Sequence, residues 1–250
     1  MKNYLFIYFF LSQAFGQYDQ VFVGSRPLSM GGAFSAVADD ANAIVWNPAG
    51  LPGLRRTEFT STFADLYDLG INQSYIGFVR PFSDRIAMGF DWSNIGFDDK
   101  ELGYSENKLN FSIGIQPHKM FSIGINVKYL MRDMLLNETS YGKSNGIGRD
   151  IGVIIKPSKN VKMGLGIYDI GGTSVSYKDR TEETILGQAF RLGISYMPIN
   201  GLTLAADYSD RLHIGAEYVL ASRVSFRTGL QQGFNSNNEN NMLIPSAGIS

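Results

Sequence analysis

Most of the chain alternates between apolar and other residues with a period of two. Within 121–129, the residues Phe, Ile, Ile, Val and Tyr alternate with Ser, Gly, Asn and Lys. Similar alternation recurs in 86–92, 111–115, 161–167, 190–196 and 224–230. Successive side chains of a β-strand point to opposite faces, so each segment has one apolar face and one glycine-rich, polar or charged face. The pattern predicts an all-β fold.

The connections between these segments alternate in length. Short turns that contain proline are expected at 81–84, 116–119, 156–159 and 197–201, and longer polar stretches at 132–145 and 171–183. This arrangement is typical of an antiparallel up-and-down meander in a membrane, with its short turns on one rim. We count about twelve strands, each near the ~9–11 residues that a tilted transmembrane strand needs.

Alternation by itself also fits a soluble β-sandwich, whose apolar faces are buried. Long strands, hairpins of alternating loop length and an export signal favour a membrane barrel over 57–250. Aromatic residues near strand ends also favour it, as in an interfacial girdle: Trp92, Tyr129, Tyr196, Tyr208 and Tyr218. We therefore predict an outer-membrane barrel in contact with lipid, with a soluble periplasmic β protein as an alternative. Because 242–250 looks like a strand just beginning, fourteen strands are expected if the C-terminus is incomplete.

The N-terminus predicts export. Lys2 precedes the apolar run 4–11, and small residues then stand at the −3 and −1 positions, Ala14 and Gly16. This run is much shorter than the ~20 residues of a transmembrane helix. The pattern is that of a signal peptide over 1–16, cleaved before Gln17.

Composition excludes several classes of function. The chain has 250 residues, 22 Lys and Arg against 23 Asp and Glu, and no cysteine. The balanced charge disfavours a nucleic-acid partner, and the absence of cysteine removes disulfides and thiolate sites. Of the two histidines, His118 falls in an expected turn and His213 on an inward face, and neither has a nucleophile context. We predict no enzyme, no metal and no cofactor.

The segment 17–56 differs from the rest because it is small-residue-rich and not strand-like. An expected short helix starts near Asp39 or Asp40 as N-cap and ends at Pro48 and Gly50. Its motifs are Met30-Gly31-Gly32-Ala33, Ala38-Asp39-Asp40-Ala41 and Trp46-Asn47-Pro48-Ala49-Gly50-Leu51. These motifs resemble the N-terminal signature of the PorV/PorQ family and, more distantly, of FadL-type outer-membrane transporters.

The resemblance implies a 14-stranded barrel with 17–56 as a plug or hatch inside it. A PorV/PorQ-type member would be a non-enzymatic binding or shuttle component of type IX secretion, with secretion-system proteins or secreted cargo as partners. A FadL-type member would transport hydrophobic small molecules. The plug residues expected from the motif are Gly31, Gly32, Asp39, Asp40, Trp46, Asn47, Pro48 and Gly50. The alternative for this segment is a capped leader to the first strand.

Charged residues on the strands are expected to face the lumen, because each would cost ~2–4 kcal/mol on the lipid face near the bilayer midplane. Both signs are mixed, whereas a selective pore tends to carry one sign. We favour a salt-bridged network that packs the lumen and holds the plug over a charge-lined channel. The residues concerned are Asp91, Lys128, Asp150, Lys162, Arg191, Asp207, Glu217 and Arg227.

Overall fold

The computed structural model describes residues 23–66, 70–98, 102–136, 139–177, 180–221, 223–233 and 242–250; the expected signal peptide, 1–16, lies outside them. Within these described residues, three short helical elements precede fourteen strands. The helical elements are α2 (Ser25–Ser29), α3 (Ala43–Trp46) and the 3-10 helix η1 (Pro48–Gly53). The strands are β1 (Glu58–Leu66), β2 (Ile71–Ser83), β3 (Ile86–Asp98), β4 (Leu102–His118), β5 (Phe121–Leu136), β6 (Thr139–Ile155), β7 (Val161–Tyr168), β8 (Thr173–Tyr177), β9 (Arg180–Leu186), β10 (Ala189–Ile199), β11 (Leu202–Tyr208), β12 (Leu212–Leu220), β13 (Val224–Gly233) and β14 (Met242–Ile249).

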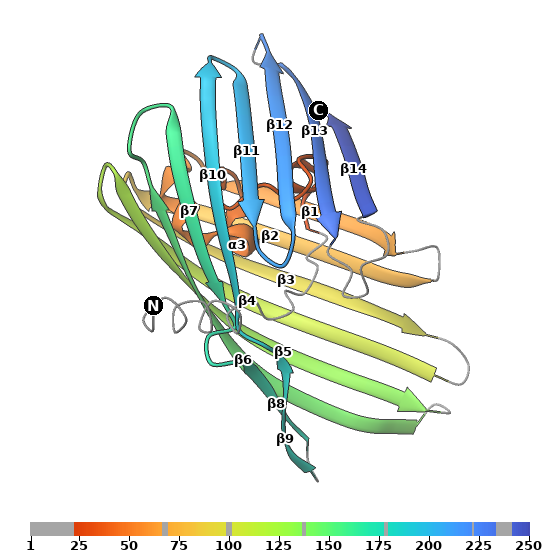
Figure 1. The fold of residues 1–250 in the computed structure, drawn as a ribbon. Coiled ribbons are helices and arrows are strands. Elements are labelled where there is room, and N and C mark those ends of the chain that lie inside the picture. The colour runs from red at the N-terminus through yellow and green to blue at the C-terminus, as the bar shows by residue number, and fades with distance from the viewer. Residues whose placement is uncertain are drawn as a thin grey trace, which may run out of the picture.

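The strands form one antiparallel sheet in which neighbours in sequence are almost always neighbours in space (Figure 1). The main path runs from β1 to β7 and on through β10 to β14, with the hairpin of β8 and β9 beside β6. This up-and-down topology confirms the predicted fold class. The sheet curls around the helices without closing, because β1 and β14 end the path and no pairing joins them in the described residues.

The two stretches expected to be long loops are mostly strand, so that prediction was wrong. β5 continues to Leu136 and β6 begins at Thr139, while β8 and β9 occupy most of 171–183. Strand pairing is made by backbone groups, so polar side chains on both faces do not end it where water reaches the strands. As a result, β4 and β6 each span 17 residues, well beyond the expected length.

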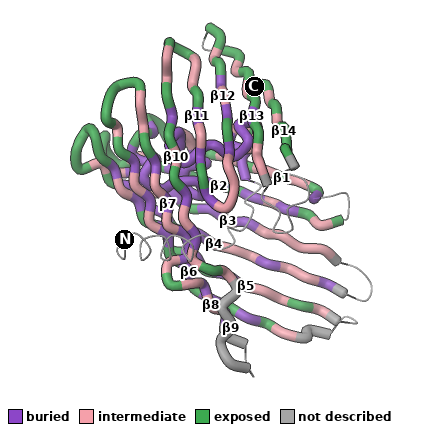
Figure 2. Tube along the Cα trace, in the orientation of Figure 1, coloured by how far each residue is buried: buried purple, intermediate pink, exposed green. Residues whose placement is uncertain are grey.

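The apolar face of the sheet points outward. On β5, Ile125 and Val127 are 45% and 48% exposed, whereas Asn126 between them is fully buried. Leu192 and Ile194 on β10 are likewise exposed. In Figure 2 the buried positions alternate along the strands where these surround the helices. This distribution is the reverse of a soluble sandwich and is what a lipid-facing wall requires.

A charge placed on the outer face tests this orientation. We expect Ile125→Arg to lower the stability of the inserted protein by about 2 kcal/mol, because the guanidinium would lie in hydrocarbon. Urea unfolding in lipid vesicles measures the change. Met120→Arg is the matched control, since Met120 is similarly exposed but lies in the turn between β4 and β5. Equal effects of the two substitutions would contradict a lipid-facing β5.

Candidate functional site

The segment 23–56 lies on the concave side of the sheet, between β1–β6 and β10–β14 (Figure 1). Its apolar side chains are buried, including Met30, Phe34 and Ile44 at 0% exposure. No helix in the described ranges is long and apolar enough to cross a membrane. We call residues 23–56 the plug segment, and the side of the sheet that it contacts the inner face.

The helix expected to start near Asp39 or Asp40 corresponds to α3 and starts later than expected. Neither Asp39 nor Asp40 is its N-cap, because α3 begins at Ala43 with Asn42 as the preceding residue. Asp40 instead accepts a hydrogen bond from the Asn42 backbone N–H at 2.8 Å, which forms a turn ahead of the helix. At the other end, Asn47 is extended, with φ −169° and ψ 103°, as expected before Pro48.

The Trp46-Asn47-Pro48 motif fastens the plug segment to itself and to the sheet. The Asn47 side-chain amide donates to Ser35 O at 2.8 Å and to Val153 O on β6 at 3.3 Å. Trp46 Nε1 donates to Val23 O at 3.0 Å. Gly50 leaves no space for a side chain, because a Cβ there would lie 1.8 Å from Ala38 O. These contacts make the segment compact.

Glycines on the inner face allow the plug backbone to touch the strands. A Cβ on Gly124 would lie 2.2 Å from Pro48 C, and one on Gly164 would lie 2.4 Å from Ser35 O. From the plug side, Gly31 has a φ of +63° and packs against the backbone of Leu230, while Gly32, with φ +79°, packs against His213. The alternation of glycine with apolar residues therefore has a packing reason: the inner face meets backbone and the outer face meets lipid.

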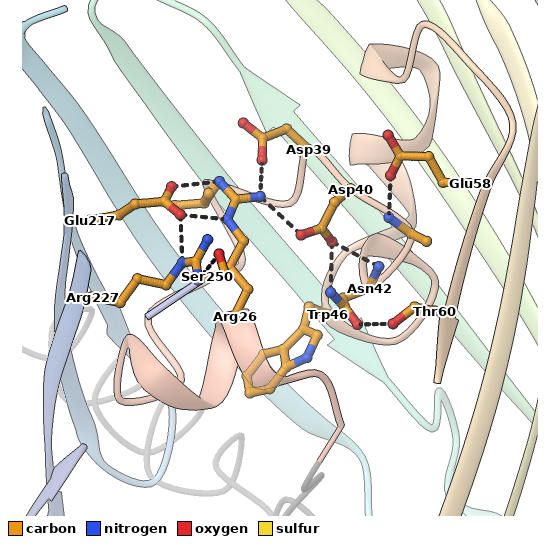
Figure 3. Close-up of polar contacts among 12 residues, drawn as sticks. Arg26, Asp39, Asp40, Asn42, Trp46, Glu58, Thr60, Glu217, Arg227 and Ser250 are labelled. Atoms are coloured by element: carbon orange, nitrogen blue, oxygen red, sulfur yellow. Dashed lines mark hydrogen bonds and ion pairs between the residues drawn. The ribbon is translucent and has the colours of Figure 1, made fainter. Parts of the chain in front are cut away.

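Arg26 is the centre of a polar cluster between plug and sheet (Figure 3). Its Nη1 donates to Asp39 at 2.7 Å and to Asp40 at 2.9 Å, both within the plug. Its Nε and Nη2 donate to the two oxygens of Glu217 on β12, at 2.9 and 2.7 Å. Arg227 on β13 donates to the same carboxylate at 2.6 Å. This bidentate pair fixes both the position and the angle of the guanidinium.

Asp39 also pairs with the sheet, since Lys162 Nζ on β7 lies 3.5 Å from its carboxylate. Asp39 is partly exposed, and the protein around it shields it from some of the water, which raises its pKa; the charges of Arg26 and Lys162 outweigh this effect and leave that pKa below its ordinary value. Asp39 is therefore ionised at neutral pH, and its charge contributes to holding the plug.

A second cluster holds the turn after Met30. Asp207 on β11 accepts hydrogen bonds from the backbone N–H of Phe34 and of Ser35, at 3.1 and 2.9 Å, and from the Ser35 hydroxyl at 2.7 Å. Arg191 on β10 donates to Gly32 O at 3.0 Å, and its guanidinium lies 4.9 Å from the Trp46 ring centroid. Charged side chains of the sheet thus satisfy backbone groups of the plug that would otherwise be buried without partners.

A third cluster lies where the strands are interrupted. β7 ends at Tyr168 and β8 begins at Thr173, while β9 ends at Leu186 and β10 begins at Ala189. Asp169, Gly171 and Gly172 have positive φ values of 49°, 78° and 80°. Facing them, residues 147–150 of β6 are not part of a strand ladder on that side, because ladder pairing passes from Gly146 with β8 to Ile151 with β7. One backbone hydrogen bond spans this gap, from Ile170 N–H to Arg149 O at 2.8 Å. We call residues 169–172 the strand break.

Lys128 on β5 occupies the centre of this third cluster. Its Nζ lies 2.8 Å from Asp150 on β6 and 2.7 Å from Asp169 in the strand break. Asp150 also accepts from the Asp169 backbone N–H at 2.9 Å, and Thr173 donates to Asp169 at 2.5 Å. The cation is buried but paired with two carboxylates, as burial of charge requires.

The eight strand charges expected to face the lumen all lie on the inner face, but their contacts differ. Lys162, Arg191, Asp207 and Glu217 contact the plug directly. Arg227 acts through Glu217, and Lys128 and Asp150 meet at the strand break. The hydrogen bond of Asp91 is made within the sheet, since it accepts from Asn110 of the neighbouring strand β4 at 3.0 Å.

Three residues central to these clusters were not among the predicted site residues: Arg26, Asp169 and Tyr168. Arg26 could have been noticed as the single cation of 23–54, a stretch that also contains the acidic pair Asp39 and Asp40. Asp169 could have been noticed because Gly171-Gly172 interrupts the alternation that precedes it. No sequence signal points to Tyr168, which belongs to the regular apolar and polar pattern of β7 but donates to Trp46 O at 2.5 Å.

Comparison with solved structures identifies the architecture. CymD, a monoaromatic hydrocarbon channel, matches with a TM-score of 0.73 and 13% identity, over 93% of this chain and 89% of CymD. A Pseudomonas aeruginosa FadL homologue matches with a TM-score of 0.59 and 12% identity, over 90% of this chain and 84% of that one. The chain has a FadL-type fold. The Pseudomonas putida toluene transporter TodX also matches, with a TM-score of 0.52, 12% identity and coverage of 93% and 96%.

No protein-family model and no curated protein matches this sequence significantly. The solved structures bear out the FadL-type part of the resemblance and do not address PorV/PorQ. At 12–13% identity, the likeness establishes the FadL-type fold alone. The function has to be argued from the site.

Proposed function

We propose that this protein is a non-enzymatic outer-membrane channel that transports hydrophobic small molecules. The main support is the way the plug segment is held on the concave side of the sheet. Its backbone packs against glycines of the inner face, and Arg26, Asp207 and their partners fasten it there. A lumen filled in this way blocks the straight aqueous path of a general pore. A hydrophobic permeant does not need that path, because it can leave the lumen between strands and enter the lipid.

The strand break supports the same function. Ordinary barrel strands pair along their whole length, because an unpaired backbone group in lipid is costly. Here the regular ladder is interrupted at one level, between the pairs Tyr168–Ala189 and Thr173–Leu186, and Ile170 N–H to Arg149 O is the backbone hydrogen bond found there to β6. The break contains two glycines with positive φ and is held by buried charges, so it is a built feature of the sheet. We take it as the place where a hydrophobic permeant passes between lumen and lipid.

The names of the neighbours support the choice of permeant. CymD is described as a monoaromatic hydrocarbon channel and TodX as a toluene transporter. Toluene is therefore the first permeant to test. The PorV/PorQ-type role in secretion remains a prediction from the motif in 26–51, and no contact in the described residues favours it over transport.

The test is uptake of radiolabelled toluene by Gram-negative cells whose own hydrocarbon channels have been deleted. Cells that carry this protein in the outer membrane should take up toluene several-fold faster than cells without it. Uptake of a sugar of similar size should stay unchanged, because the plug blocks water-soluble solutes. If toluene uptake does not rise although the protein is inserted and shows heat-modifiable gel mobility, the proposal is wrong.

A further inference from the structure

We propose that Lys128 is a positioning residue that couples the strand break to the plug, so that loosening one loosens the other. The inference rests on the proposed function for its biological meaning. A continuous chain of buried polar contacts leads from the break to two backbone carbonyls of α3, Ile44 O and Trp46 O. Hydrogen exchange can be measured in the break and in the plug without any permeant.

The first part of the chain joins the break to the sheet. Asp169 is the first residue of the break and has a φ of 49°, which an aspartate adopts at a cost. Its side chain is held by Lys128 on β5 at 2.7 Å and by Thr173, the first residue after the break, at 2.5 Å. Gly148 provides the space, because a Cβ there would lie 2.9 Å from both Lys128 Cε and Asp169 Oδ1. The cluster therefore offsets the cost of the strained backbone.

The second part joins the same cluster to the plug. Asp150, the other partner of Lys128, accepts a hydrogen bond from Asn126 Nδ2 at 3.1 Å. The same amide group donates to Ile44 O in α3 at 2.8 Å. Tyr168, the residue before the break, donates to Trp46 O at 2.5 Å. Two carbonyls of α3 are thus held by residues next to this cluster, Ile44 O by Asn126 on β5 and Trp46 O by Tyr168 on β7, and Lys128 acts on the plug through Asp150 and Asn126.

All the groups in this chain are buried, so they cannot exchange partners with water one at a time. Lys128 is 7% exposed, Asp150 3%, Asp169 7% and Asn126 0%. Removing one member leaves a buried charge or donor unsatisfied, which is more costly than breaking the same contact in water. The favoured response is for the neighbours to move together, and this couples plug and break.

The experiment is hydrogen exchange on the full chain in lipid nanodiscs, comparing wild type with Lys128→Met. We expect exchange to rise roughly tenfold at 169–173 and several-fold at 43–47, as for the loss of a charged hydrogen bond. Lys143→Met is the control, because Lys143 makes the same kind of ion pair, with Asp133 at 3.2 Å, on a side chain that is 72% exposed. It should change neither region. Lys128→Arg keeps the charge and should restore most of the protection in both.

A rise confined to 169–173 would overturn the coupling, since Lys128 would then only support the break locally. A rise spread evenly over β1–β14 would also overturn it, because it would indicate general destabilisation. Should Lys128→Met fail to insert, Lys128→Gln carries the same test, because it keeps a polar side chain but removes the charge shared by Asp150 and Asp169, and it should raise exchange at 43–47 and 169–173 alike. Toluene uptake measured in parallel decides the proposed function separately, since exchange does not depend on a permeant.

Discussion

Arg26→Ala is expected to release the plug from the inner face while the sheet stays folded. The substitution removes four hydrogen bonds and leaves Asp39 and Asp40 without their shared cation. Removal of one partner from a buried ion pair costs ~3–5 kcal/mol. Glu217 keeps Arg227 as a partner and Asp39 is partly exposed, so we expect the docking of the plug to weaken by about 3 kcal/mol.

Two measurements follow the release of the plug in the Arg26→Ala variant. Backbone amides in 23–56 should exchange much faster, and water-soluble sugars should begin to enter cells that carry the variant. Arg85→Ala is the control, because Arg85 is exposed in the turn between β2 and β3. If Arg26→Ala left exchange in the plug at the wild-type rate, the Arg26 cluster would not be what holds the plug.

The sheet could be predicted from the sequence because its two faces meet different surroundings. Ile125 and Val127 must be apolar where they meet lipid, and Gly124 and Asn126 must be small or polar where they meet the plug. Each face restricts the residue type at every second position, so a period of two is visible in a single sequence. The direction of the apolar face followed from the charges on the other face, each too costly to place in lipid.

The contacts of the plug could not be predicted in the same way. Arg26 and Glu217 are 191 positions apart, and no local pattern states that one reaches the other. The helix position was also misjudged, because Asp40 precedes an apolar run as an N-cap would, but it caps a turn instead. In this segment the backbone is folded by contacts with many different strands, and propensity over four residues is too weak to place a helix.

Gly124→Val should have a similarly large effect by a different physical route. The Cβ would lie 2.2 Å from Pro48 C and 2.4 Å from Ala49 N, which are backbone atoms and cannot rotate away. Overpacking costs ~1–3 kcal/mol when neighbours can adjust. Here the adjustment requires movement of the whole 3-10 helix η1, so we expect a loss of plug docking of about 3 kcal/mol.

The expected result of Gly124→Val is faster hydrogen exchange at 47–53 with unchanged heat-modifiable mobility, because the strand itself tolerates valine well. Gly187→Val is the matched control, since a Cβ at Gly187 would meet no atom within 4 Å. Arg26→Ala and Gly124→Val act on opposite sides of the plug, through charge and through shape. If Arg26→Ala released the plug and Gly124→Val did not, the close fit between the plug and the inner-face glycines would not be what holds the plug in place.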